Sequence, residues 1–329
     1  MRAKKSVFQK YGKQNVELGF GQSYSEGTKR LLNKDGTFNI DRKNTVKSIY
    51  VDLVKMSWKK FFIYTFYFYA IVNILFGTLY FLFGPEKIHV KPEHPIFYQY
   101  FECISFSVQT LATVGYGVLH PDSISANILT SIEALFGILV FAIMTGLCYS
   151  RFSKPTAGYK FSHQALIAPY QNINSLQVRV ANHRNSNIVE VEASFMFSME
   201  VDDNGVNKRI FLNLPLERNK IYYLPLSWTI VHPITPDSPL YNKTPDDLKD
   251  GNAELIVMIK AHDDAYSQTI HGNTSYTSDE IIWGAKFIPS YYTGKNGKAT
   301  FEIDKLGDYN PAELNKFENI PNTTETDTN

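Results

Sequence analysis

The chain has 329 residues, of which 44% are hydrophobic and 14% aromatic, and its formal net charge is +1. This length is sufficient for two structural units, and the slightly negative mean hydropathy implies that most of the chain is in contact with water. The near-zero net charge gives no reason to expect a nucleic-acid partner. Its two cysteines, Cys103 and Cys148, lie in apolar stretches, which argues against a disulfide scaffold and fits a reduced, cytosolic outer domain.

The N-terminal region, residues 1–44, is predicted to be cytoplasmic, and it has no apolar segment that would predict a cleaved signal peptide. After it, residues 48–58 are amphipathic, because four apolar side chains recur at helical spacing on one face: Tyr50, Leu53, Val54 and Trp58. This pattern predicts an interfacial helix that lies along the inner surface of a membrane. An ordinary linker helix is the alternative.

Two long apolar segments are predicted to span the membrane within a pore domain, residues 45–155. The first, residues 59–83, is uncharged after its two leading lysines and is long enough to cross the hydrocarbon core as a helix. The second, residues 123–152, carries one carboxylate, Glu133, and is followed by Pro155, which blocks further helix.

Two spans place both termini on the same side, and the distribution of basic residues identifies that side. Lysines and arginines flank the predicted inner ends of both spans, whereas Lys87 and Lys91 between the spans are offset by Glu86 and Glu93. We therefore expect a multi-pass protein of the cell (inner) membrane with cytoplasmic N- and C-termini. Basic side chains at the inner ends are the candidates for contact with anionic phospholipid headgroups: Lys59, Lys60, Arg151 and Lys154. Ordinary positive-inside anchoring, without regulation, is the alternative.

Between the spans, residues 98–110 are too short to cross a membrane, and they lead to Thr113, Val114, Gly115, Tyr116 and Gly117. The first segment predicts a re-entrant pore helix whose C-terminal end favours a cation. The second is the sequence of a selectivity filter, whose backbone carbonyls replace the hydration shell of K⁺. A glycine-rich turn in a soluble domain is the alternative, and the flanking apolar runs disfavour it. Since one copy cannot enclose an ion, the filter implies a cyclic homotetramer.

From residue 156 to residue 306 the pattern changes to short β-rich runs separated by turns. The alternation in Val189–Ala193 and turn clusters such as Asp202–Gly205 predict a cytoplasmic, antiparallel, immunoglobulin-like β-sandwich. The predicted fold class is therefore an α+β membrane protein with two transmembrane helices, a re-entrant pore helix with its filter, and a β-sandwich. Residues 307–329 are expected to be a frayed tail.

The order of these elements over residues 35–305 resembles that of the inward-rectifier potassium channels, in particular their prokaryotic branch. Four stretches besides the filter carry the resemblance: Phe106–Ala112, Ser227–Ile234, Asp237–Tyr241 and Asp279–Gly284. The absence of cysteines flanking the pore departs from eukaryotic relatives. The resemblance implies passive, K⁺-selective conduction that is gated at the inner helix crossing and by the cytoplasmic domain, and modulated by anionic lipids.

Two side chains are expected to support the filter. Gln109 stands where many members of that family place a glutamate paired with an arginine beyond the filter, but the matching outer residue here is Val118 or Leu119. That ion pair cannot form, so an amide hydrogen bond is the expected substitute, and a cation channel of relaxed selectivity is an alternative function. Glu133, a carboxylate within a span, is expected to lie behind the pore helix or filter, with direct ion contact in the cavity as the alternative.

The second span also holds the candidate gate. Gly137 and Gly146 are candidate bend points, or small residues that permit close helix packing. Tyr149 lies where the resemblance places a bulky constriction that closes by dewetting, and an interfacial aromatic residue is the alternative. Phe141 occupies a position that is acidic in strongly rectifying relatives, so block by polyamines is expected to be weak.

In the predicted sandwich, the resemblance assigns pore-lining roles to two segments. Asp264 matches an acidic position of the family and Asp263 precedes it, with a pair of solvated loop carboxylates as the alternative. Residues 268–273 match the loop at the apex of the cytoplasmic domain, and three of them are candidates for a second constriction: Ile270, His271 and Gly272. His271 would make that constriction sensitive to pH.

No enzyme is expected from this sequence. The eight histidines show no paired metal-ligand spacing, and there is neither a nucleophile elbow nor a phosphate-binding glycine loop. The predicted ion ligand is K⁺, bound at the filter only and without a cofactor, and Ba²⁺ is an expected blocker. A membrane-anchored β-sandwich receptor or binding protein with an inert filter is the alternative from another class.

Overall fold

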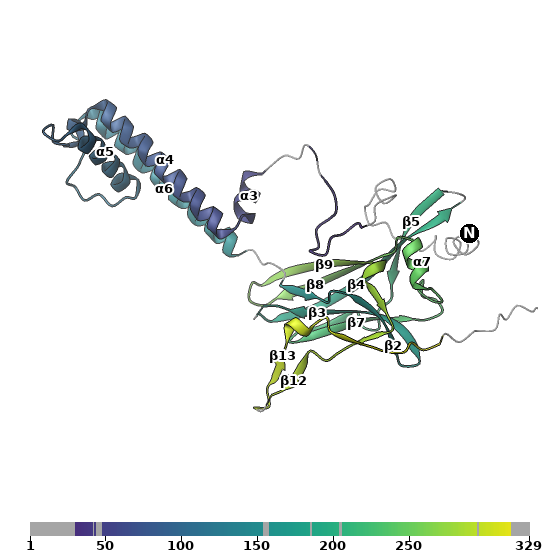
Figure 1. The fold of residues 1–329 in the computed structure, drawn as a ribbon. Helices are drawn as coiled ribbons and strands as arrows, with labels where there is room; N and C mark the ends of the chain where they lie inside the picture. The colour runs from purple at the N-terminus through teal and green to yellow at the C-terminus, as the bar shows by residue number, and fades with distance from the viewer. Residues whose placement is uncertain are drawn as a thin grey trace, which may run out of the picture. The chain divides into compact units, whose positions relative to one another are not determined.

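The structure is a computed structural model that describes residues 30–41, 43, 48–153, 158–184, 186–203, 206–294 and 296–316. It divides into two compact units (Figure 1), a membrane unit, Lys43–Lys154, and a sandwich unit, Met1–Arg42 with Pro155–Asn329. Each unit has its own hydrophobic core.

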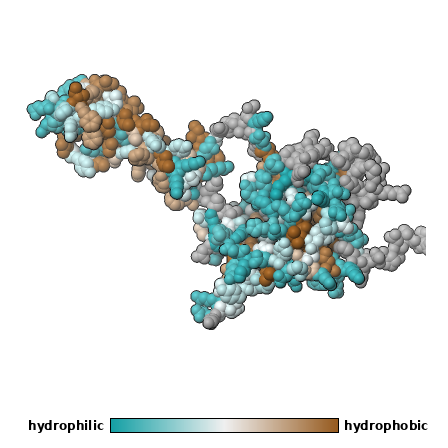
Figure 2. All heavy atoms as spheres, in the orientation of Figure 1, coloured by the Kyte–Doolittle hydropathy of each residue, from teal (hydrophilic) through white to brown (hydrophobic). Residues whose placement is uncertain are grey.

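The described helices of the membrane unit are α3 (Ile49–Lys55), α4 (Trp58–Phe83), the 3-10 helix η2 (Pro85–Ile88), α5 (Ile96–Leu111) and α6 (Ile124–Phe152). α4 and α6, with 26 and 29 residues, are long and apolar enough to cross a membrane. In Figure 2, apolar side chains cover much of the visible surface of these helices, whereas the visible surface of the sandwich unit is mostly hydrophilic. Helices with so much exposed apolar surface need lipid or another protein chain around them.

The interfacial helix is shorter than residues 48–58, the range that the sequence predicts. α3 ends at Lys55, because Met56 adopts an extended conformation. Trp58, which the sequence places in the same helix, is instead the first residue of α4, and the side chain of Ser57 caps that helix. The assignment of Trp58 to the interfacial helix is therefore wrong, since serine is a strong N-cap residue and starts a new helix here.

Two glycines allow the pore helix α5 to approach both spans. An ideal Cβ at Gly77 in α4 would lie 2.7 Å from Cγ1 of Ile104 in α5. An ideal Cβ at Gly137 in α6 would lie 2.6 Å from the carbonyl oxygen of Leu111, at the end of α5. Close packing of this kind depends on small residues in membrane helices. The hydrophobic core of this unit includes Val72, Phe76, Tyr80, Cys103, Phe106 and Ala126.

The sandwich unit is built from two five-stranded sheets. The first sheet contains β1 (Tyr159–Phe161), β2 (Ala165–Tyr170), β3 (Ile173–Asn182), β7 (Ser227–Ile234) and β10 (Ile281–Trp283). The second contains β4 (Ile188–Asp203), β5 (Val206–Leu214), β6 (Lys220–Tyr223), β8 (Glu254–Asp263) and β9 (Gln268–Thr277). Apolar side chains of both sheets form one core, and a short helix, α7 (Pro245–Asp250), precedes β8.

One strand pair departs from the predicted antiparallel arrangement. β10 runs parallel to β2, with Ile281 opposite Ala165. It reaches the first sheet through η3 (Ser278–Glu280) from β9 in the second sheet. A crossover between sheets, unlike a hairpin, does not force the new strand to run antiparallel to its neighbour.

The C-terminal residues up to 316 belong to the sandwich unit. β11 (Ala285–Phe287) pairs with β14 (Tyr309–Pro311), and β12 (Tyr291–Thr293) pairs with β13 (Ala299–Phe301). After β14, Leu314 packs against the core and the amide of Asn315 donates to Asn174 Oδ1 at 2.9 Å. The predicted frayed tail is therefore wrong over residues 307–316, and residues 317–329 lie outside the described part of the chain.

The N-terminal region also contributes to the sandwich unit, which the sequence did not indicate. Leu31 and Leu32 are buried, and their amides donate to the carboxylate of Glu254 on β8 at 2.8 and 3.1 Å. Arg30 forms an ion pair with Glu280 at 3.0 Å. Residues 30–41 are thus held against the second sheet by both apolar and charged contacts.

Candidate ion-conduction site

The predicted filter residues form a loop between α5 and α6 in which alternate residues have left-handed backbone angles. The φ angles of Thr113, Gly115 and Gly117 are 56°, 56° and 81°. Alternation of this kind turns successive carbonyl oxygens toward the same side of the chain, which a row of K⁺ sites requires. Glycine adopts these angles at little cost, whereas Thr113 must be held there by its surroundings.

The end of the pore helix holds the beginning of the filter. The amide of Thr113 donates to the carbonyl of Thr110 at 3.0 Å, and the amide of Val114 donates to the carbonyl of Gln109 at 2.9 Å. These bonds fix the direction in which the chain leaves α5.

Within the described part of a single chain, the Gln109 side chain makes no hydrogen bond, so the predicted amide substitute for the missing ion pair is not found there.

Glu133 is fully buried where α4, α5 and α6 meet. Its carboxylate accepts hydrogen bonds from Tyr80 Oη in α4 at 2.6 Å and from Ser107 Oγ in α5 at 2.5 Å. Ser107 Oγ is also 3.2 Å from Asn73 Oδ1, and Tyr80 Oη is 3.1 Å from Thr130 Oγ1. Glu133 therefore contacts the back of the pore helix and does not face an ion path. Two hydroxyl partners satisfy a carboxylate that would otherwise be costly to bury.

The two candidate bend points in α6 have different surroundings. The position of a Cβ at Gly137 is occupied by the carbonyl of Leu111, as described above, whereas no atom lies within 4 Å of an ideal Cβ at Gly146. α6 is continuous from Ile124 to Phe152, through both glycines. Gly137 is therefore a close-packing position, and Gly146 is the candidate that has room to bend.

Phe141 and Tyr149 are left uncovered by the described part of the chain. Their exposed fractions are 75% and 72%. Tyr149 lies in the last turn of α6, since its carbonyl accepts from the amide of Ser153, the residue that ends the helix. Both aromatic side chains are available to face an axis shared with other copies of the chain.

Arg151, which the sequence assigns to lipid headgroups, is instead bound to the end of the interfacial helix. Its guanidinium donates to the carbonyl oxygens of Leu53, Val54 and Met56, the last two at 3.2 and 2.7 Å. The guanidinium carbon also lies 4.4 Å from the ring centre of Trp58. The last carbonyls of a helix lack intrahelical donors and attract a cation, which is the physical reason for this correction. Arg151 thus ties α3 to the C-terminal end of α6.

The other basic residues of the predicted lipid contact differ in status. Lys59 and Lys60 are exposed in the first turn of α4, whereas Lys154 lies outside the described residues.

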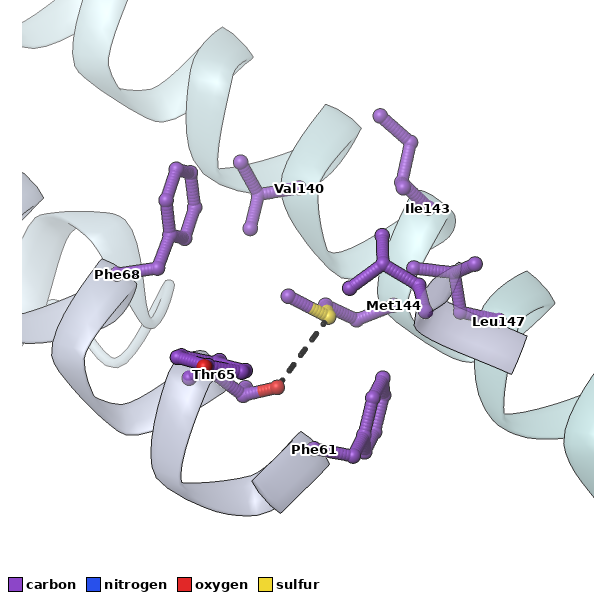
Figure 3. A pocket seen from close by; sticks show the side chains of 9 residues that line it. Phe61, Thr65, Phe68, Val140, Ile143, Met144 and Leu147 are labelled. Carbon is purple, nitrogen blue, oxygen red and sulfur yellow. Dashed lines mark hydrogen bonds between the residues drawn. The ribbon is translucent and has the colours of Figure 1, made fainter. Parts of the chain in front are cut away.

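Further along α4, a cavity of about 270 Å³ separates this helix from α6 (Figure 3). Its lining is apolar apart from Thr65 and the hydroxyl of Tyr64, and Thr65 Oγ1 lies 3.9 Å from Met144 Sδ.

Asp263 does not line a pore, contrary to the prediction. It is 1% exposed, and its carboxylate accepts from the amide of Ala265 at 3.0 Å and from Ser186 Oγ at 3.2 Å. It therefore fixes the turn that follows β8, as aspartate often does. Burial and the nearby Asp263 also raise the pKa of Tyr159. Asp264, the residue that matches the acidic position of the family, is exposed.

The predicted apex loop, residues 268–273, is the beginning of β9, and the turn between β8 and β9 covers residues 264–267. Ile270 is 3% exposed and belongs to the sandwich core. Gly272 is buried so closely against Tyr159 that an ideal Cβ would lie 2.2 Å from the ring. Strand alternation leaves His271 as the exposed member of the three. The assignment of Ile270 and Gly272 to a cytoplasmic constriction is therefore wrong.

Comparison with known proteins places both units in one family. Residues 159–321 match the family described as "Inward rectifier potassium channel C-terminal domain", and residues 61–154 match "Ion channel". The chain is 34% identical to the inward rectifier potassium channel Kirbac3.1 of Paramagnetospirillum magnetotacticum, over 84% of this chain and 94% of that protein. It is 26% identical to the ATP-sensitive inward rectifier potassium channel 15 of Homo sapiens, over 84% of this chain and 81% of that protein. It is 25% identical to the ATP-sensitive inward rectifier potassium channel 12 of Gallus gallus, over 81% of this chain and 68% of that protein.

These similarities confirm the predicted resemblance and the predicted fold class. They cover the pore helix, the filter and the sandwich, and they agree with two helices long enough to span a membrane. Because the similarity extends over both units, the chain belongs to the inward-rectifier potassium channel family and is a potassium channel of its prokaryotic type.

Proposed function

We propose that four copies of this chain assemble around one axis as a homotetramer, so that their filter carbonyls form rings that bind K⁺. A single chain supplies one wall of such a path, because Val114 and Tyr116 are 50% and 74% exposed. The second span supports the same proposal, because one chain leaves most of α6 uncovered: only 11% of its most apolar 18-residue stretch is buried. Neighbouring copies and lipid would cover the rest of that surface.

The proposed orientation places both termini in the cytoplasm of a cell with the channel in its inner membrane. Basic residues at the inner ends of the spans, including Lys59 and Lys60, support it. In this orientation the sandwich unit is cytoplasmic, and the segment between α4 and α5 faces the opposite side together with the residues after the filter. Conduction is passive and needs no covalent step, so we expect no enzymatic activity and no cofactor.

The proposed gate is the inner end of α6, where four Tyr149 side chains would meet and close the path by dewetting. Gly146 is three residues before Tyr149, and the space around it would permit the bend that separates these side chains. We propose that the sandwich unit biases this gate. We expect polyamines to block the channel only weakly. The position that is acidic in strongly rectifying relatives is Phe141 here, and at the β8–β9 turn Asp263 is buried, which leaves Asp264 as the exposed carboxylate.

We also propose that anionic phospholipids modulate the gate through Lys59, Lys60 and Lys154. Lys59 and Lys60 are exposed at the start of α4, and each such contact is worth about 1 kcal/mol near the membrane surface. Arg151 is left out of this group because the carbonyls of α3 already bind it.

The single observation that carries the proposal is the alternation of left-handed φ angles at Thr113, Gly115 and Gly117. Uptake of Rb⁺ into proteoliposomes, with Ba²⁺ as blocker, tests it. Gly115→Ala should abolish the uptake, because alanine strains a φ of 56°. Gly297→Ala is the matched control, since Gly297 has a φ of 70°, has no atom near its ideal Cβ and lies in the sandwich unit. Uptake that persists in Gly115→Ala would refute the assignment of the filter.

A channel of relaxed cation selectivity is the second candidate, because the Gln109 side chain has no hydrogen-bond partner within the described part of one chain. Reversal potentials in mixed K⁺ and Na⁺ separate it from a strictly K⁺-selective channel. A membrane-anchored binding protein with an inert filter would instead give no ion flux at all from purified protein.

A further inference from the structure

Two histidine side chains stack on each other beside the filter. His89 follows η2 in the segment between α4 and α5, and His120 is the third residue after Gly117. Their ring centres are 3.9 Å apart, with an angle of 26° between the ring planes. His89 Nε2 also lies 3.4 Å from Asp122 Oδ2. These contacts join the segment before the pore helix to the loop that follows the filter.

Backbone hydrogen bonds hold His89 and Asp122 in place. The amide of Asp122 donates to the carbonyl of Lys87 at 2.9 Å, next to the contact between the Asp122 carboxylate and His89. His89 has a left-handed φ of 62°, and its amide donates to the carbonyl of Glu86 at 3.2 Å. The residues on either side of His89 are buried, with exposed fractions of 1% for Ile88 and 3% for Val90. The ring of His89 therefore projects from a fixed turn toward the loop after the filter.

This connection adds polar contacts to the apolar packing of Leu119, which lies in the same loop and packs against the core of the membrane unit. Val118 and Leu119 are uncharged, so neither can form an ion pair that anchors the loop after the filter. In the described part of the membrane unit, the histidine stack and the two Asp122 contacts connect that loop to the segment before the pore helix. Loss of the stack would therefore loosen the outer end of the filter.

The charge on the two rings decides whether they can remain stacked. Histidine gains its proton between about pH 8 and pH 5. Two neutral rings, or one neutral and one charged ring, can stack, whereas two imidazolium rings at this separation repel each other.

Other charged side chains lie on the segments around the pair. Glu86 and Lys87 belong to η2, and Lys91 and Glu93 follow it. On the pore helix, the carboxylate of Glu102 is already bound to His94, at 3.1 Å from its Nδ1. Asp122 is thus the carboxylate in contact with His89, and the separate His94–Glu102 pair provides a control in the same segment of the membrane unit.

We propose that the His89–His120 stack is a proton-sensitive latch at the outer mouth of the filter. At neutral pH it holds the loop after the filter, and at acidic pH on the outer side both rings are charged, the stack separates and the K⁺ current falls. This inference rests on the proposed conduction and orientation, and it adds a regulatory input on the side opposite the sandwich unit.

The test is K⁺ current through the full-length channel in a planar bilayer, with the pH of each chamber lowered in turn from about 7.5 to about 5.5. Acid on one side should reduce the current by roughly threefold or more, and acid on the other side should have a smaller effect. His120→Phe keeps a ring in the stack but cannot be protonated, so it should conduct equally at both pH values. His89→Phe should behave in the same way, and His94→Asn should keep the wild-type response.

Three results would overturn the latch. These are a wild-type current that ignores acid on both sides, an acid response that survives in His120→Phe and His89→Phe, or a response that His94→Asn removes. Absence of any K⁺ current at about pH 7.5 is a different failure, because it overturns the proposed conduction and the latch together.

Discussion

The hydroxyl of Tyr80 donates a hydrogen bond of 2.6 Å to the buried carboxylate of Glu133, and so joins the first membrane-spanning helix to the second. Ser107 on the pore helix donates to the other carboxylate oxygen at 2.5 Å. One acidic side chain therefore holds three helices at a single point. Because α5 leads directly into the filter, the position of the filter depends on this contact.

Removal of the Glu133 carboxylate should destabilise the channel. Glu133→Ala leaves the hydroxyls of Tyr80 and Ser107 with only their longer contacts, to Thr130 Oγ1 at 3.1 Å and to Asn73 Oδ1 at 3.2 Å. Each lost hydrogen bond contributes about 0.5–1.5 kcal/mol to stability. We expect a lower thermal unfolding midpoint in detergent and a loss of most Rb⁺ uptake. Glu133→Gln, which keeps an acceptor for Tyr80, should retain more of both. Ile132→Ala is the matched control, since the neighbouring Ile132 is 55% exposed. Wild-type stability in Glu133→Ala would contradict this role.

The two glycines of α6 should respond differently to the same substitution. Gly137→Ala places a methyl group 2.6 Å from the carbonyl oxygen of Leu111, so it should displace the pore helix and reduce the yield of folded tetramer. Gly146→Ala meets no atom within 4 Å and should leave folding intact while changing the open probability. Size-exclusion chromatography and single-channel recording distinguish the two effects. Equal tetramer yields from both variants would count against the packing role of Gly137.

Arg151 should be needed to hold the interfacial helix. Arg151→Ala removes the donors to the carbonyls of Leu53, Val54 and Met56, and Arg151→Lys cannot reproduce the planar set of donors. We expect amide hydrogen exchange in residues 49–56 to increase at least severalfold in both variants. Lys59→Ala, which removes an exposed positive charge nearby, should leave that exchange unchanged. Unaltered protection of α3 in Arg151→Ala would show that other contacts hold the helix.

His232 should make the stability of the sandwich unit depend on pH. Burial lowers its pKa below the ordinary value of 6.5, and its ring lies between the carbonyl of Pro215 at 2.6 Å and Ser238 Oγ at 2.8 Å. The unfolded chain therefore binds a proton at a higher pH than the folded chain does. Stability from this group is present above about pH 6.5 and is lost as the pH falls toward the lower folded pKa.

Thermal unfolding of the full chain between about pH 7.5 and pH 5 measures this effect. His232→Gln should unfold at a lower temperature at neutral pH, because it disturbs both hydrogen bonds, but its midpoint should vary less with pH. His163, which is exposed, provides the control, and His163→Gln should keep the wild-type slope. An unchanged slope in His232→Gln would assign the pH dependence to other groups.

The parts of this protein that the sequence predicted are those with local signals. An apolar run long enough to cross a membrane, and the glycine pattern of the filter, are complete within short windows of residues. The contacts of Glu133 cannot be predicted from such a short window, because its partners Ser107 and Tyr80 lie 26 and 53 positions away in the chain. The contact of Leu31 with Glu254 spans 223 positions, and only the folded chain brings them together.

Two of the errors have specific physical causes. A basic residue at the end of a membrane helix suits lipid phosphate and helix C-terminal carbonyls equally well, so the sequence could not show that Arg151 binds the carbonyls of α3. Ile270 was assigned to a loop by resemblance, although an isoleucine between polar neighbours is typical of a strand with one buried face. Its alternation with His271 could have identified β9 from the sequence.

The most direct measurement of the central claim is the reversal potential of the purified channel in a bilayer with K⁺ on one side and Na⁺ on the other. Rings of carbonyl oxygens from Thr113 to Tyr116 predict a current that reverses far from zero, in the direction that K⁺ selectivity demands, and that Ba²⁺ blocks. Gly297→Ala should reproduce that value, whereas Gly115→Ala should conduct little or nothing. A Ba²⁺-insensitive current that reverses near zero would contradict the account.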